Sequence, residues 1–332
     1  MKILVTGGCG YIGGHTVHQL LELGHDVTVL DDLSTGRIDN LVLSSDGCKF
    51  RLGDTADATR LDEVMGGNNF DVVMHFAACI DVNESIHNPM AYYQNNTANT
   101  ISVIRACERH NINRLIYSST AAVYGIIGDR EFVAEECPTR PTNPYAQSKL
   151  MSERIIKDYI VARPQFGCII LRYFNVAGSG GRVGPGPKSR HLIRNACRTA
   201  LGTQSYLQIF GTNYNTPDGS CIRDYIHVED VARAHIDAMN YLKKGGTFDV
   251  FNCGYGKGLS VKEIVSAVKR VSGREIPIQI DLPREGDVAK VVANCSKIKR
   301  VLGWEPKHAN IEEIIRSSLE WERDYAPVLA GV

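Results

Sequence analysis

The first 31 residues contain the feature that most restricts the fold. An apolar run at 2–6 is typical of a short buried strand, and it ends in a glycine-rich turn. Residues 16–23 then have helical periodicity, and a second apolar run at 27–30 ends at Asp31. The turn glycines are Gly7, Gly10 and Gly13. Strand, turn, helix, strand and acidic residue in this order predict a βαβ unit that binds a dinucleotide.

The turn and the acidic residue each have a chemical role in this prediction. The glycines, with Tyr11 and Ile12 between them, let backbone amides at a helix N-terminus approach a pyrophosphate closely. Asp31 stands at the end of the second strand, where its carboxylate would accept hydrogen bonds from a ribose 2′-hydroxyl and repel a 2′-phosphate. We therefore expect NAD, not NADP, as the cofactor.

The rest of the chain predicts a large α/β domain with a smaller lobe. Its 332 residues fit one large α/β domain or two unequal ones. Further strands are expected before Asp54 and at 70–76, 114–120, 166–174, 207–211, 248–252 and 276–280. A long helical region is expected at 83–109, and helices are expected from 143 onward, at 191–201, after 223–230, and at 260–271 and 311–325. This alternation predicts a doubly wound, parallel Rossmann sheet.

The domain division that we expect is interleaved in sequence. The NAD-binding Rossmann domain is expected at residues 1–175, with a returning segment at about 225–254. The smaller α/β lobe, which would bind the substrate, is expected at 176–224 and 255–332. A loop rich in glycine and proline at 178–187 is either a plain surface loop or a mobile cover over a site, because both kinds share this composition.

Composition excludes several classes of function. Lysine plus arginine equals aspartate plus glutamate at 37 each, which argues against nucleic-acid and membrane partners. No apolar run approaches the ~20 residues that span a bilayer, and the run at 2–6 is too short for a signal peptide. The ten cysteines occur singly, without zinc spacing, so we expect no metal site. Free thiols of this kind favour a reducing, cytoplasmic location.

The segment 143–149 carries a candidate catalytic pair. Tyr145 and Lys149 are four residues apart, so on a helix both point to one face. Asn143 suits the cap of such a helix and Pro144 its first position. A nearby ammonium would stabilise the phenolate and move the pKa of Tyr145 towards neutral pH. The spacing alone also fits an ordinary solvated helix face.

Several motifs together carry a resemblance to a known family. The spacing G-x-x-G-x-x-G resembles the extended branch of the short-chain dehydrogenase/reductase superfamily. Four further segments resemble the UDP-glucose 4-epimerase family within that branch, and the likeness runs from the first strand to 302–304. These segments are 171–175, 216–219, 223–228 and 284–287. The resemblance implies reversible, NAD-dependent epimerisation at C4 of a UDP-hexose, UDP-galactose to UDP-glucose, through a 4-keto intermediate.

The resemblance also implies roles for individual residues. Thr120 would complete a catalytic set with Tyr145 and Lys149. The further residues expected at a tightly bound, recycled NAD are Asp54, Phe76, Ala77, Ala78, Asn95, Ser118 and Tyr173. Those expected at the UDP-sugar, besides Thr120 and Tyr145, are Asn175, His191, Leu192, Phe210, Arg223, Arg284, Asp287 and Val291. A homodimer formed by helices near 85–110 and 145–163 is expected as well.

Other activities of the superfamily fit the residues less well. A 4,6-dehydratase needs an acid/base pair after Thr120, but Ala121 and Ala122 cannot transfer protons. A decarboxylase acting on a UDP-uronate is disfavoured because its acidic residue is missing at the same place. A regulatory protein that merely binds NAD would be free to lose Tyr145 or Lys149, and both are present.

The chain departs from the family pattern at a few positions. Ile80 stands where some members have a lysine, and Arg194 stands where proline is frequent. The loop at 178–187 is unusually rich in glycine and shorter than the family pattern, so the contacts to uracil are expected to depart from that pattern there. Val291 occupies the position that limits the sugar pocket, where a tyrosine would exclude an N-acetyl group. Because valine is smaller, we expect the N-acetylhexosamine pair to be accepted as well.

Overall fold

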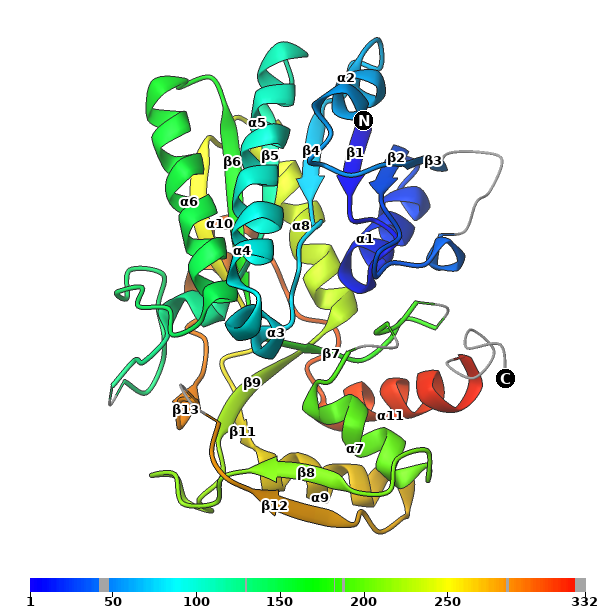
Figure 1. Ribbon diagram of the computed structural model, residues 1–332, viewed down its shortest axis with the longest axis vertical. Helices are drawn as coiled ribbons and strands as arrows, with labels where there is room; N and C mark the ends of the chain where they lie inside the picture. The colour runs from blue at the N-terminus through cyan, green and yellow to red at the C-terminus, as the bar shows by residue number, and fades with distance from the viewer. Residues whose placement is uncertain (42–47, 129, 182, 187–188, 285–286, 326–332) are drawn as a thin grey trace.

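A seven-stranded parallel sheet forms the centre of the larger part of the protein (Figure 1). The computed structural model describes residues 1–41, 48–128, 130–181, 183–186, 189–284 and 287–325. The strand order is β3-β2-β1-β4-β5-β6-β10, and all neighbours are parallel. These strands are β1 (Lys2–Thr6), β2 (Asp26–Asp31), β3 (Cys48–Leu52), β4 (Val72–His75), β5 (Arg114–Thr120), β6 (Gly167–Tyr173) and β10 (Phe248–Cys253). The predicted Rossmann sheet is confirmed.

Both faces of this sheet are covered by helices. Ile3 and Val5 of β1 pack into one apolar cluster, whereas Leu4 points to a second cluster on the opposite face. On the first side α8 contacts both α1 and α10, and on the second side α5 contacts both α2 and α6. Their bounds are α1 (Tyr11–Glu22), α2 (Ala58–Met65), α5 (Asn99–Arg109), α6 (Pro144–Ala162), α8 (Val228–Lys243) and α10 (Ser296–Leu302). Among the described residues, no helix is long and apolar enough to cross a membrane.

The smaller lobe contains two short sheets and three helices. In the first sheet, β9 pairs with β7, β11 and β13, and in the second β8 pairs with β12. The strands are β7 (Asn175–Ala177), β8 (Leu207–Phe210), β9 (Ile222–His227), β11 (Gly258–Ser260), β12 (Ile278–Asp281) and β13 (Lys290–Val291). The helices are α7 (Leu192–Ala200), α9 (Val261–Ser272) and α11 (Ile311–Glu320), which continues into a π-helical turn (Trp321–Tyr325). Ile193, Ile264 and Ile314 join the three helices in one apolar cluster.

The carboxyl ends of the central strands face the smaller lobe. In Figure 1 the arrowheads of β1 and β4 point towards β7 and β9. A short 3₁₀ turn, η3 (Ala121–Tyr124), follows β5 at this edge, and a second one, η1 (Ile38–Asn40), follows β2. Ligands of open α/β sheets bind at this edge, so the fold directs the search for a site to these strand ends.

The helical region expected at 83–109 is confirmed, but it is divided into several helices. The chain forms α3 (Val82–His87), α4 (Pro89–Tyr92) and a π-helical turn (Tyr93–Ala98) before α5 begins. The break lies at Asn88, whose φ of −133° is not helical. Pro89 explains the break, since a proline disfavours helical geometry in the residue before it.

Other differences concern bounds and short elements. Helix α1 begins at Tyr11, five residues before the periodic stretch, because the glycines of the turn enter its first turns. The strands β7, β9, β11 and β13 and the helix α10 were not predicted. Part of the loop expected at 178–187, including Arg182 and Pro187, lies outside the described residues, as do Glu285 and Gly286 of the segment 284–287.

Candidate active site

The glycine-rich turn holds the end of β1 against the end of β4. Gly7 has a φ of +72°, and a Cβ there would lie 2.5 Å from the Ala77 nitrogen. A Cβ on Gly13 would overlap the Gly7 carbonyl oxygen, so both positions require glycine. Gly10 is the N-cap of α1, and no side chain caps this helix start. The first amides of α1, at Tyr11 and the residues after it, can therefore face an anion.

Asp31 stands beside this turn at the end of β2. Its side chain is buried, and its two oxygens accept hydrogen bonds from the Cys9 and Leu33 amides, each at 2.9 Å. Burial raises the pKa of the Asp31 carboxyl above its ordinary value, and the two amide hydrogen bonds offset part of this rise. Each oxygen keeps a lone pair that can accept from a hydroxyl. The uncapped helix start and this carboxylate together fit the pyrophosphate and ribose of NAD.

Lys149 is a buried cation at the carboxyl end of β5. It is 3% exposed, and its Nζ donates to the Ser118 carbonyl oxygen at 2.8 Å. The Nζ also lies 5.0 Å from the centroid of the Tyr117 ring. Burial lowers the pKa of Lys149 to about 7, against the opposite influence of Cys79 and Glu153. An ammonium has three donors, so Lys149 can hold further acceptors.

Tyr145 lies one turn before Lys149 on α6. The helix starts as expected, because Asn143 Oδ1 accepts from the Ala146 amide at 2.9 Å and Pro144 takes the first position. The Tyr145 ring meets the Tyr92 ring edge-on, with centroids 6.4 Å apart.

The electrostatics of Tyr145 differ from the expectation. Burial raises the pKa of Tyr145 above its ordinary value, and the hydrogen bond with the Thr120 hydroxyl offsets only part of this rise. The lowering that we expected from Lys149 does not contribute to this pKa, and the Lys149 ammonium donates instead to the Ser118 carbonyl oxygen. Thr120 ends β5, and its Oγ1 accepts from the Ala122 amide at 3.1 Å. The fold therefore brings Thr120 to Tyr145.

Two asparagines hold the chain that follows β4. The Cys79 amide donates to both Asn95 Oδ1, at 3.1 Å, and Asn96 Oδ1, at 2.8 Å. Asn96 Nδ2 also donates to the Cys79 carbonyl and to Ser148 Oγ, each at 3.0 Å. Sequence reasoning selected Asn95 and missed Asn96, although Asn96 joins this loop to α6. Their adjacency in the sequence was the available signal.

Tyr173 is held by a histidine that the sequence did not single out. Its hydroxyl lies 2.5 Å from His235 Nε2. His235 Nδ1 bonds to the Val231 carbonyl at 2.9 Å, so Nε2 carries the lone pair and accepts from Tyr173. The Phe76 ring lies 4.5 Å from the His235 ring. Three side chains from β6, α8 and the end of β4 thus pack together.

The small lobe brings several predicted substrate residues together in two groups. Arg223 of β9 pairs in register with Val291 of β13, and its Nη2 lies 3.8 Å from Asp287 Oδ1. The Arg284 guanidinium lies 3.8 Å from the centroid of the Phe210 ring. Arg284 therefore covers one face of the half-buried Phe210 ring.

The ring of His191, which precedes α7, packs against Tyr11 at the glycine-rich turn. Its ring is nearly parallel to that of Tyr11, at an interplanar angle of 13° and a centroid distance of 6.5 Å. Its Nδ1 caps α7 through the Arg194 amide, and burial lowers its pKa to about 4. Tyr11 in turn donates its hydroxyl to the Gly178 carbonyl at 2.5 Å. The predicted substrate and cofactor regions are therefore in contact.

Arg194, which stands where proline is frequent, has a structural role. It forms a buried ion pair with Glu322, with Nε and Oε1 2.6 Å apart. It also donates to the Gly186 and Ser189 carbonyls. The arginine therefore ties the loop before α7 to the turn after α11, and a proline could make none of these contacts.

The remaining predicted residues lie near the strand ends. Asp54, exposed after β3, accepts from Asn99 Nδ2 at 3.3 Å. Asn175 is exposed at the start of β7, and Leu192 packs beside the apolar cluster of the small lobe. Ala78 is half-buried at the end of β4.

The buried Lys149 predicts a specific pH dependence of stability. Its folded pKa of about 7 lies below the ordinary value of 10.5, so between these values the unfolded chain holds a proton that the folded chain lacks. In protein freed of dinucleotide, we expect Lys149→Met to be more stable than wild type below pH 7, by a few kcal/mol. This gain should shrink as the pH rises from 7 to 10, measured by urea unfolding.

The matched control is Lys157→Met, which removes an exposed lysine from the same helix. Its stability difference from wild type should be small and nearly constant over the same range. If the stability gained by Lys149→Met does not change with pH, Lys149 is not the buried, titrating group that we assign.

Comparison with known proteins places this geometry in a family. Residues 3–254 match the model of the NAD dependent epimerase/dehydratase family. The UDP-glucose 4-epimerase of Azospirillum brasilense is 46% identical over 325 residues, which cover 97% of this chain and 92% of that protein.

Solved structures agree with this match. The UDP-glucose 4-epimerase of Bifidobacterium longum in complex with NAD+ and UDP is 36% identical, with a TM-score of 0.91 and coverage of 97% and 98%. The UDP-Glc/GlcNAc 4-epimerase of Campylobacter jejuni is 43% identical, with a TM-score of 0.85 and coverage of 97% and 99%. The chain therefore belongs to the NAD dependent epimerase/dehydratase family, and the relatives that it resembles over their full length are UDP-sugar 4-epimerases.

Proposed function

We propose that the protein catalyses reversible epimerisation at C4 of a UDP-hexose, UDP-galactose to UDP-glucose, with a tightly bound NAD that is recycled in each turnover. The observation that carries this proposal is the set of Thr120, Tyr145 and Lys149 at the carboxyl end of β5. The residues after Thr120 are Ala121 and Ala122 in η3. Neither alanine can act as an acid or base for dehydration. The chemistry that Thr120, Tyr145 and Lys149 support is therefore the reversible oxidation of the sugar.

The catalytic set performs the proton transfer. The Tyr145 phenolate accepts the proton of the sugar 4-hydroxyl, and the Thr120 hydroxyl donates a hydrogen bond to the same oxygen. Lys149 stabilises the phenolate and binds the ribose next to the nicotinamide. NAD, which Asp31 and the amides of the glycine-rich turn would hold, would supply the hydride acceptor and donor for the sugar C4, and the positive charge of its oxidised form would favour the phenolate of Tyr145. The 4-keto sugar must turn over between these steps, so that the hydride returns to the other face.

The small lobe supplies the nucleotide anchor in this proposal. Arg223 and Arg284 neutralise the diphosphate, and Asp287 binds a ribose hydroxyl. Phe210 stacks on the uracil, and Asn175 donates to a phosphate. His191 and Leu192 complete the nucleotide side. Firm contacts to the nucleotide and loose contacts to the sugar allow the keto sugar to turn.

The remaining expected roles complete the proposal. The residues around NAD are Gly7, Gly10, Tyr11, Ile12, Gly13, Asp31, Asp54, Phe76, Ala77, Ala78, Asn95, Ser118 and Tyr173. We keep the expected division into an NAD-binding domain of residues 1–175 with about 225–254 and a substrate lobe of 176–224 and 255–332, with two adjustments: α10 packs against α8 and β10 of the larger part, and β9 belongs to the small sheet. Since all ten cysteines are free, we place the reaction in the cytoplasm.

Removal of the phenol tests the function directly. We expect Tyr145→Phe to lower kcat for UDP-galactose by at least about a thousandfold, because the general base and its hydrogen bond are lost. Binding of NAD and UDP, measured by calorimetry, should stay within a factor of about three. Tyr159→Phe on the same helix is the control and should keep full activity. Near-normal turnover by Tyr145→Phe would refute the assignment.

We also propose that the enzyme interconverts the N-acetylhexosamine pair. Val291 is half-buried and pairs in register with Arg223, so its side chain stands next to the proposed diphosphate anchor. A valine leaves room for a larger C2 substituent than a tyrosine would. The similarity to the Campylobacter jejuni UDP-Glc/GlcNAc 4-epimerase supports the proposal.

A single substitution separates the two substrates. Val291→Tyr should lower kcat/KM for UDP-N-acetylglucosamine by at least about tenfold, because the ring fills the space for the N-acetyl group. Activity on UDP-galactose should fall much less, and Val291→Ala should keep both activities. Wild-type protein that converts UDP-galactose but not the N-acetyl substrate would show the proposal to be wrong.

We propose further that the protein forms a homodimer through α3, α4, α5 and α6. These neighbouring helices expose Ile86, Met90, Ile101 and Met151, with Met90 at 72% exposure. Such a row of apolar side chains on adjacent helices fits a second copy of the same surface, joined by a two-fold axis.

A charge on this surface should break the dimer. Met90→Asp buries a carboxylate at the proposed interface, so we expect a shift towards monomer in analytical ultracentrifugation at micromolar concentration. The control, Leu282→Asp, changes an apolar side chain that is 82% exposed after β12 and should leave the dimer intact. A monomeric wild type, or a Met90→Asp dimer as tight as wild type, would exclude this interface.

A further inference from the structure

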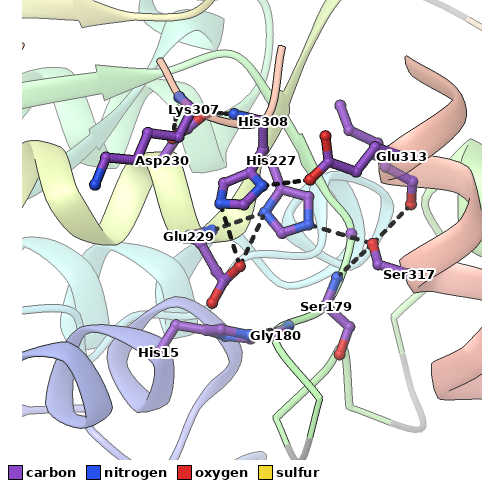
Figure 2. Close-up of polar contacts among 12 residues, drawn as sticks. His15, Ser179, Gly180, His227, Glu229, Asp230, Lys307, His308, Glu313 and Ser317 are labelled. Carbon is purple, nitrogen blue, oxygen red and sulfur yellow. Dashed lines mark hydrogen bonds and ion pairs between the residues drawn. The ribbon is translucent and has the colours of Figure 1, made fainter. Parts of the chain in front are cut away.

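Three metal-ligating side chains from distant parts of the chain meet at the start of α8. They are His227 at the end of β9, Glu229 in the first turn of α8, and His308 in the segment before α11 (Figure 2). One potential ligand atom from each lies within 4.8 Å of the others, and no other such group of three occurs in the described part of the chain. We propose that this histidine–glutamate cluster binds a divalent transition-metal ion such as Zn²⁺.

The distances within the cluster suit a tetrahedral ion. His308 Nε2 lies 3.5 Å and His227 Nδ1 3.9 Å from the same carboxylate oxygen, Glu229 Oε2. Zinc lies about 2.0–2.1 Å from its nitrogen and oxygen ligands, which separates neighbouring ligand atoms by about 3.4 Å. Both distances to the carboxylate oxygen are close to this spacing, and all three ligand atoms lie within 4.8 Å of one another, so a water would take the fourth position. Two imidazoles and one carboxylate are ligands that zinc prefers.

Hydrogen bonds fix His227 in the tautomer that a metal requires. The Ser317 hydroxyl donates to the Ile314 carbonyl, so its oxygen accepts from His227 Nε2, 3.2 Å away. Nδ1 consequently carries the lone pair, and it is directed at the start of α8, where it now accepts from the Glu229 amide at 3.2 Å. The His227 side chain is only 2% exposed, so the packing around it fixes the orientation of the ring.

His308 is oriented in the corresponding way. Its Nδ1 lies 2.5 Å from Glu313 Oε1, which is the carboxylate–histidine arrangement found behind metal-bound imidazoles. Its Nε2 is thereby directed towards Glu229 (Figure 2). The backbone that carries it is held by the buried Asp230, whose carboxylate accepts from the Lys307 and His308 amides at 2.9 Å each.

The position of the cluster indicates what a metal would do. It joins the start of α8, the segment before α11 and, through Ser317, the Ser179 amide of the loop after β7. None of these residues belongs to the proposed catalytic set of Thr120, Tyr145 and Lys149. The ion would therefore cross-link the small lobe to the central domain and stabilise the fold, without entering the reaction.

Metal binding by matched variants tests the proposal. Full-length protein is stripped with a chelator, dialysed against micromolar Zn²⁺ and analysed for metal content. We expect one ion per wild-type chain, and binding at least about tenfold weaker in His308→Gln and in Glu229→Gln. His110→Ala is the control, since it removes a half-exposed histidine that pairs with Asp62 and should bind as wild type does.

Two further measurements identify the ligands of the bound ion and its effect on stability. Co²⁺ in place of Zn²⁺ should give the visible absorption of a tetrahedral nitrogen and oxygen site, without the thiolate bands that a cysteine site would show. Zn²⁺ should raise the melting temperature of wild type and of His110→Ala, but not that of His308→Gln. Zinc binding equal in wild type and His308→Gln, thiolate bands, or no bound zinc at micromolar concentration would each overturn the proposal and leave an ordinary ion pair.

Discussion

The active site depends on the ammonium group of Lys149, which is buried where few other groups can compensate for its positive charge. Lys149 is almost fully buried, and its Nζ bonds to one backbone carbonyl, that of Ser118. Burial of an ammonium with so little compensation destabilises the charged form, which is why its pKa falls to about 7. The end of β5 supplies the carbonyl and α6 supplies both Lys149 and Tyr145, so the fold holds the lysine one helical turn from the tyrosine.

The surrounding elements position Lys149 and Tyr145. Asn143 and Pro144 set the start of α6, and Asn96 bonds both to Ser148 on that helix and to the loop after β4. Thr120 is brought to Tyr145 by the length of β5. The glycine turn and Asp31 stand at the same edge of the sheet, so a dinucleotide bound there would reach Lys149. The small lobe faces this edge and contributes the arginines.

Much of this architecture was predictable from the sequence because it is encoded locally. The unit from β1 to Asp31 and the cap of α6 depend on residues that are neighbours in the chain, so their patterns are visible in the sequence. Strand β13 has two residues, and its pairing with Arg223 is a long-range contact that no local pattern encodes. The break at Asn88 was readable from Pro89 but was missed.

The contacts that could not be predicted from the sequence join residues that are far apart in the chain. His235 of α8 accepts a hydrogen bond from the Tyr173 hydroxyl of β6, and Arg194 pairs with Glu322 across the small lobe. His308 meets His227 only in the folded chain, which is why the sequence predicted no metal ligands. Departures from a family pattern, as at Arg194, are the places where such contacts can be sought.

The fate of the hydrogen at C4 tests the central claim most directly. Purified protein is incubated with UDP-galactose carrying deuterium at C4, without added dinucleotide, and the product is analysed by NMR. Our account predicts UDP-glucose with the deuterium retained at C4, because the same hydrogen leaves and returns within one active site. Loss of the label to solvent, or no conversion at all, would contradict it.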